Sequence, residues 1–187
     1  RLAMEPPDVN FPDAVHPHLQ AICLKAVAVR PSERYQSADD LIHALSGHLD
    51  LRDALDMVHE GAGYLKDLRI AVDEDASDQT VSHLGFQCRF TFEQALRKSS
   101  SLKDARSGVL DTLQVLLEYR VSKGEVEYAR RLLAELHGLG VDPDRLERAE
   151  RLVTEASSQR QRADEIATQI QYKLMEQLQA EVDKDRA

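Results

Sequence analysis

Apolar residues recur at intervals of three and four along most of the chain, which is the spacing of amphipathic helices. Stripes at residues 19–26 and 41–49 predict two helices separated by a turn. Pro31 is expected to end the first helix, because the residue before a proline is disfavoured in helical conformation. Ser37, followed by two acidic residues, predicts the start of the second helix. Helical spacing then continues to about residue 68.

Further along, the acidic stretch 73–78 interrupts this spacing and predicts a loop. Three shorter helices follow, at about residues 81–97, 102–122 and 125–137. From about residue 145 to residue 183 neither glycine nor proline interrupts a segment rich in Glu, Gln, Arg and Ala, which predicts one long helix. Strand-forming runs are hard to find, so the sequence predicts an all-α fold.

The composition narrows the classes of function. Apolar residues make up 42% of the chain and charged residues 30%, the balance of a soluble helical protein. A net charge of −9 without a basic stripe argues against nucleic acid as a partner. Cys23 and Cys88 lack a disulfide or zinc spacing and predict a reducing, cytoplasmic location. No apolar run approaches the length of a bilayer span, so we expect no membrane contact in this segment.

We predict no catalytic, cofactor-binding or metal-binding residues. Gly61-Ala62-Gly63 begins like a phosphate-binding loop, but Lys66 stands at the third glycine position and no strand precedes it. That segment is therefore predicted to be a flexible helix junction. The acidic stretch 73–78 lacks the glycine and glutamate that a calcium loop needs, and the seven histidines lack metal spacing.

One part of the sequence resembles a known family. The run Leu-Gln-Ala-Ile-Cys-Leu-Lys-Ala at 19–26, then Pro-Ser-Glu-Arg-Tyr-Gln-Ser-Ala at 31–38, is similar to the last two helices of the kinase C-lobe in bacterial, eukaryotic-like serine/threonine kinases. In that family the arginine matching Arg34 pairs with the glutamate of an Ala-Pro-Glu motif. The resemblance thus implies structural roles for Pro31 and Arg34. Arg30 departs from the pattern, since many members carry an acid there.

The family's catalytic motifs are not in this sequence, which has no glycine-rich loop, His-Arg-Asp or Asp-Phe-Gly. The resemblance therefore implies a non-catalytic C-terminal portion of a kinase, which contacts an upstream catalytic domain in cis and other proteins through its helical surfaces. Within this chain, Arg34 is expected to pair with Glu33, Asp39 or Asp40, or to stay in solvent. A free-standing helical-repeat adaptor unrelated to kinases is the alternative interpretation.

The middle of the chain resembles an irregular pair of tetratricopeptide repeats, and this implies that Gly124 lies at a close turn and Ala129 at a helix crossing. Arg120 and Leu136 depart from the repeat pattern. An antiparallel helical bundle explains the same apolar stripes equally well. The residues that fit the repeat pattern are Leu113, Leu116, Leu117, Gly124, Ala129 and Leu133.

These observations divide the chain into four parts: the kinase-like helices at 1–49, a helical connector with an acidic loop at 50–78, the tetratricopeptide-like bundle at 79–140 and the long helix at 141–187. In the last part an apolar stripe predicts partner contacts at Ile166, Ile170 and Leu174 and a coiled-coil homodimer. A linker to a further domain is the alternative. The stripe consists of Ala163, Ile166, Ile170, Leu174, Leu178 and Val182.

Overall fold

The computed structural model describes residues 11–185, with side chains as far as residue 179. This part of the chain contains six α-helices, one short 3₁₀ turn and no strand, which confirms the all-α prediction. The elements are α1 (Pro17–Ala26), η1 (Pro31–Glu33), α2 (Ala38–Asp73), α3 (Asp78–Lys98), α4 (Lys103–Ser122), α5 (Val126–Gly138) and α6 (Pro143–Asp185).

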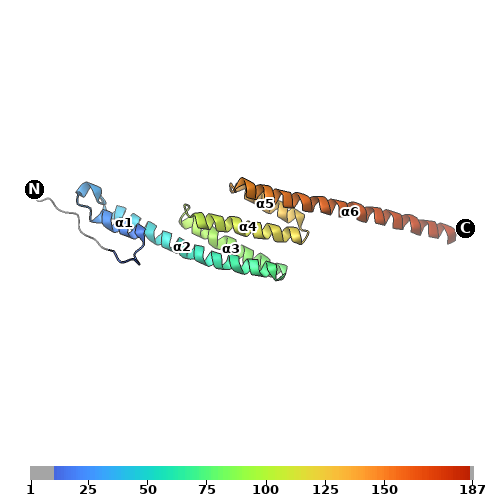
Figure 1. Ribbon diagram of the computed structural model, residues 1–187, viewed down its shortest axis with the longest axis horizontal. Coiled ribbons are helices and arrows are strands. Elements are labelled where there is room, and N and C mark those ends of the chain that lie inside the picture. The colour runs from blue at the N-terminus through green and yellow to red at the C-terminus, as the bar shows by residue number, and fades with distance from the viewer. Residues whose placement is uncertain (1–10, 186–187) are drawn as a thin grey trace, which may run out of the picture.

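The helices stack in chain order into an elongated molecule (Figure 1). Each helix from α2 onward contacts the next, and α4 also contacts both α2 and α6. α1 and the first half of α2 project at one end, while the second half of α6 projects at the other (Figure 1). The fold is therefore a stack of helices with one helical segment projecting at each end.

Several helix ends follow directly from local chemistry. The Ser37 hydroxyl accepts the Asp40 N–H, and the Asp40 carboxylate accepts the Ser37 N–H, both at 3.1 Å, so a capping box starts α2 as predicted. Pro31, by contrast, does not end α1. That helix stops at Ala26, and Pro31 opens the 3₁₀ turn, where its missing N–H needs no acceptor.

The predicted flexible junction in α2 is wrong, because α2 runs without a break through Gly61 and Gly63. Gly61 is buried beneath the ring of Phe92 on α3, and a Cβ atom at Gly61 would lie only 2.9 Å from that ring. On α4, a Cβ atom at Gly108 would lie 2.3 Å from the same ring. Both glycines are therefore needed for close packing rather than for flexibility.

A small polar contact lies beside Phe92. The Cys88 thiol and the Thr112 hydroxyl lie 2.9 Å apart, and Thr112 donates to the carbonyl of Gly108 at 2.7 Å. Burial raises the pKa of the Cys88 thiol, against the opposite effect of the Thr112 hydrogen bond. Cys88 is thus a neutral, buried thiol that packs as a small apolar side chain.

The hydrophobic core spans α2 to α6, and Ala54 is its first member among the described residues. Gly124 has a φ of +73° in the turn between α4 and α5, and Ala129 is fully buried on α5. The core members that come from α2 are Ala54, Leu65, Leu68 and Ala71, and those from the later helices include Phe92, Leu113, Leu117, Leu136 and Val153. The first half of α2 thus lies outside the core.

The glycines give a matched test of this packing. We expect Gly108→Ala to lower the free energy of unfolding by about 1–3 kcal/mol, because the new methyl group displaces the Phe92 ring. Gly63→Ala should instead raise it by about 0.5–1 kcal/mol, since Gly63 is a helix-interior glycine with nothing within 4 Å of its Cβ position. Urea unfolding of both variants checks this, and two changes of the same sign contradict it.

Candidate interaction surfaces

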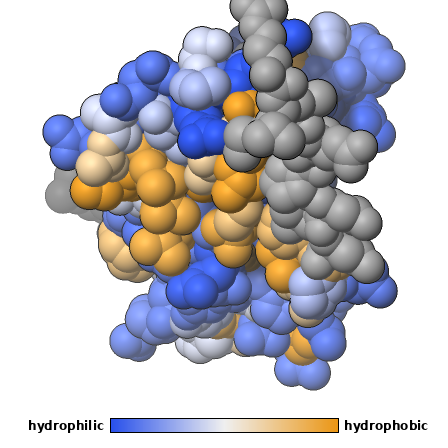
Figure 2. Space-filling model, turned by 90° about the vertical axis from the view of Figure 1, so that its left-hand side faces the viewer, coloured by the Kyte–Doolittle hydropathy of each residue, from blue (hydrophilic) through white to orange (hydrophobic). Residues whose placement is uncertain are grey.

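Apolar side chains remain uncovered at the N-terminal end of the molecule. Ile42, Leu45 and Leu49 follow one face of α2 at steps of three and four. Leu24 on α1 and Val27, the residue after α1, are also exposed. These five side chains are between 39% and 57% exposed, and we call them the N-terminal apolar surface. Figure 2 shows apolar side chains gathered on this end of the molecule. Clustered exposed apolar side chains are typical of sites where a protein, a membrane or a ligand binds.

Arg34 shapes the turn that joins α1 to α2. Its Nε donates to the carbonyl of Ala28 at 2.7 Å, and the residue is half-buried. No carboxylate in the described part of the chain lies within ion-pair distance of Arg34, so the expected pairs with Glu33, Asp39 or Asp40 do not form. The reason is local, because Glu33 pairs with Arg30 at 3.2 Å and Asp40 caps α2.

The same turn is closed by Gln36. Its side-chain amide donates to the carbonyl of Pro31 at 3.1 Å and to that of Arg34 at 2.7 Å. The Lys25 ammonium lies 4.5 Å from the centre of the Tyr35 ring. The structure thus places Pro31 and Arg34 together in one hydrogen-bonded turn at the edge of the N-terminal apolar surface.

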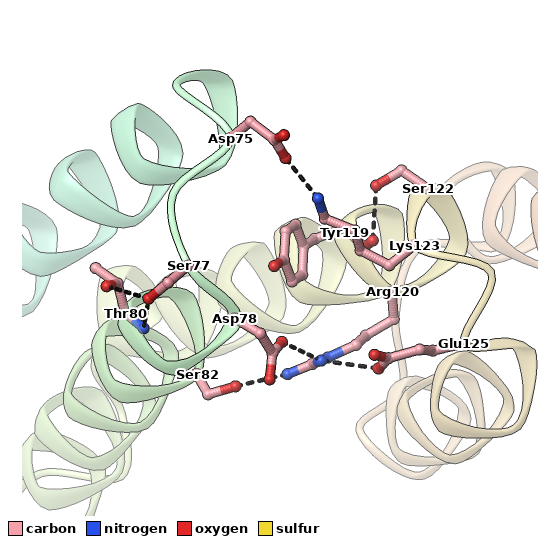
Figure 3. Close-up of polar contacts among 10 residues, drawn as sticks. All are labelled: Asp75, Ser77, Asp78, Thr80, Ser82, Tyr119, Arg120, Ser122, Lys123 and Glu125. Atoms are coloured by element: carbon pink, nitrogen blue, oxygen red, sulfur yellow. Dashed lines mark hydrogen bonds and ion pairs between the residues drawn. The ribbon is translucent and has the colours of Figure 1, made fainter.

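Arg120 forms a buried ion-pair network that the sequence did not reveal (Figure 3). Its side chain is 6% exposed and bonds the Asp78 carboxylate, the Glu125 carboxylate at 2.8 Å and the Ser82 hydroxyl at 2.6 Å. The guanidinium also lies 4.6 Å from the centre of the Tyr128 ring. Arg120 therefore ties the start of α3 and the start of α5 to the end of α4.

The carboxylates around Arg120 raise its pKa by more than burial lowers it. Burial by itself lowers the pKa of Arg120, but the hydrogen bond to Glu125 and the negative charge of Asp78 give a net rise, so the guanidinium is always charged. Nearby, Lys123 pairs with Asp75 across the two inter-helix turns (Figure 3). The sequence did hold one sign of this network. Arg120 follows Leu113 and Leu117 at the helical spacing of buried positions, where a charged residue is rare unless it is paired.

At the other end of the molecule, a groove of about 1410 Å³ lies between the start of α5 and the middle of α6. Its walls include Tyr128, Val153, Ser157 and Arg160. Tyr128 is 47% exposed there, although its ring is in contact with Arg120. The groove is open to solvent.

Beyond the groove, α6 is uncovered on every side. All described side chains from Ser158 to Gln179 are exposed, and they include Ile166 at 58%, Ile170 at 61% and Leu174 at 54%. The predicted stripe is therefore present and free of other helices as far as it is described, while the side chain of Val182 lies outside the described residues.

Residues 11–179 contain no group of three or more His, Cys, Asp or Glu side chains that could hold a metal ion. In the same part of the chain, no helix combines the length and hydropathy of a membrane span. Comparisons with protein-family models, with curated proteins and with solved structures find no match.

Substitutions at Arg120 and Lys123 test how much each cation contributes to the stability of the fold. We expect Arg120→Leu to lower the free energy of unfolding by about 1.5–3 kcal/mol, because it removes the charge-assisted hydrogen bonds that the buried guanidinium donates to Asp78, Glu125 and Ser82. Lys123→Gln, which removes a solvent-exposed ion pair, should change it far less. Urea unfolding measures both, and similar losses for the two variants contradict a special role for Arg120.

Proposed function

We propose that this chain is the non-catalytic, C-terminal regulatory and scaffolding portion of a bacterial serine/threonine protein kinase. The observation that carries the proposal is the N-terminal apolar surface. The segment that resembles the last two helices of a kinase C-lobe is also the segment whose apolar side chains are left without cover and outside the core. A catalytic domain that precedes this chain covers that surface in cis.

The state of Arg34 supports the same proposal. In the kinase family the matching arginine pairs with a glutamate at the end of the activation segment. Here Arg34 is half-buried and donates one N–H to Ala28, while no carboxylate in the described residues occupies its guanidinium. This arrangement leaves the arginine able to accept a carboxylate partner from the preceding domain.

On this proposal the chain itself has no enzymatic activity, binds no cofactor and works in the cytoplasm. Phosphotransfer needs a phosphate cradle, metal ligands and a base, and these belong to the catalytic domain. The helical stack then holds partner surfaces at a fixed distance from that domain, because α2 is one continuous helix from the kinase-like segment into the core.

A free-standing helical-repeat adaptor is the second candidate, and the open groove between α5 and α6 favours it. The two candidates differ in what precedes Arg1 in the reading frame. The kinase proposal expects a glycine-rich loop, His-Arg-Asp and Asp-Phe-Gly within about 250 residues, the usual upper size of a domain. An upstream frame without these motifs leaves the adaptor as the better account.

Arg34 provides the mutational test. In a longer protein that includes the preceding domain, Arg34→Ala should cost about 3–5 kcal/mol of stability, because it leaves a buried carboxylate without its partner. Arg30→Ala is the control, since Arg30 forms only an exposed pair with Glu33, and it should change stability by about 0.5 kcal/mol or less. Equal unfolding curves for the longer wild-type protein and its Arg34→Ala variant contradict the kinase assignment.

We also propose that α6 mediates a homodimer through Ile166, Ile170 and Leu174. Sedimentation of the chain at about 50 μM, well above a dissociation constant on the order of 1 μM, should then show a dimer. Changing both Ile166 and Ile170 to Asp should give a monomer. Tyr172→Asp is the control, because Tyr172 lies on the opposite face of the same helix and is 68% exposed. A wild-type chain that sediments as a monomer removes the support for the dimer.

A further inference from the structure

Three histidines meet where α1 lies against α2. His48 on α2 is only 9% exposed, and its ring centre lies 5.7 Å from that of His16 and 5.6 Å from that of His18. The Nδ1 atom of His48 is buried and has no hydrogen-bond partner among the described residues. Together with Leu19 and Leu51, the rings of His16 and His48 line a small cavity of about 250 Å³.

Three side chains that can carry positive charge face His48. They are His16 and His18, at the start of α1, and Arg52, one helical turn beyond His48 on α2. His16 is the N-cap of α1, where its Nδ1 accepts the N–H of His18 at 3.2 Å. The first turn of α1 has no acidic residue, so the positive end of the helix dipole adds to the same charge.

The nearest carboxylates along the chain do not offset this charge. Asp50 and Asp53 on α2 pair with Lys98 of α3. Asp13, in the segment before α1, is exposed and lies outside ion-pair distance of the three histidines. Burial, followed by the influence of His18, His16 and Arg52, lowers the pKa of His48 below its ordinary value of 6.5.

α1 is joined to the rest of the molecule by few contacts. Ile22 is its only buried residue among those described, and the hydrophobic core starts at Ala54. α1 can therefore separate from α2 while the packing of α2 to α6 stays intact, as in other local openings of weakly packed segments.

We propose that His16, His18 and His48 form an acid-sensitive latch, whose protonation below about pH 6 releases α1 from α2. In the released state the His48 imidazole is hydrated and takes up a proton at its ordinary pKa, whereas His16 and His18 are exposed already in the docked state. The docked state is consequently at full stability above about pH 6.5, and that stability is lost as the pH falls through the lowered pKa of the docked His48. This inference does not depend on the kinase assignment.

Hydrogen exchange of the whole chain, read by mass spectrometry at about pH 7.5 and about pH 5.5, tests the latch directly. The measurement includes a metal chelator, and rates are corrected for intrinsic exchange at each pH. Peptides from α1 should lose protection at the lower pH, while peptides from α3 and α4 keep it. Equal corrected protection of α1 at both pH values overturns the proposal.

Variants separate the histidine cluster from a general effect of acid. His48→Leu, which keeps an apolar side chain at this position, should leave α1 protected at both pH values, whereas His59→Gln, at an exposed position on α2, should respond like wild type. If His48→Leu fails to hold α1 even at the higher pH, His16→Asn with His18→Asn decides, because Asn keeps the N-cap. That double variant should weaken the pH response without abolishing it, because burial of His48 remains, and an unchanged response contradicts the latch.

A metal ion bound by the same rings is the competing outcome. If α1 responds to pH only when Zn²⁺ is added and the chelator is omitted, the cluster is a metal site and the proton-driven account is wrong.

Discussion

Phe92 holds α3 against the backbones of α2 and α4, at the two places where those helices carry glycine. A side chain at Gly108 would enter the space that the ring occupies, and one at Gly61 would press on its edge. Because an aromatic ring buries a large apolar area, this contact fixes how close the three helices approach. The Cys88 thiol of α3 also contacts the Thr112 hydroxyl of α4 at 2.9 Å.

Arg120 continues the stack from these three helices to α5. Its buried guanidinium pairs with Asp78 and Glu125, whose carboxylates are partly exposed, so the turns before α3 and before α5 are held together. The result is a well-packed middle section with an uncovered helical face at each end. One end carries the N-terminal apolar surface and the histidine latch, and the other carries the open groove and the stripe of α6. The proposed functions all lie at these two ends, where packing within the chain is incomplete.

The spacing of apolar residues predicted the helices well, because a helix that packs on its neighbours with one face carries apolar residues on that face and polar residues on the rest. It could not predict the role of Gly61, because the sequence does not show which ring lies above a glycine. Arg120 was missed for a similar reason, as its partners come from residues 42 positions earlier and five positions later. Of the two alternatives for Arg34, the ion pairs with Glu33, Asp39 or Asp40 do not form, since Glu33 and Asp40 are already engaged in local contacts. The roles of Gly61 and Arg120 thus depend on contacts between residues far apart in the sequence, which local patterns do not reveal.

The first half of α2 lies outside the hydrophobic core and carries exposed apolar side chains, while the second half of the same helix lies in the core. Hydrogen exchange along α2 at neutral pH compares the two halves within one helix and one sample. Amides at residues 42–49 should exchange much faster than those at residues 61–72, since only the latter are buried against α3 and α4. Equal protection along the whole of α2 would contradict this division of the helix.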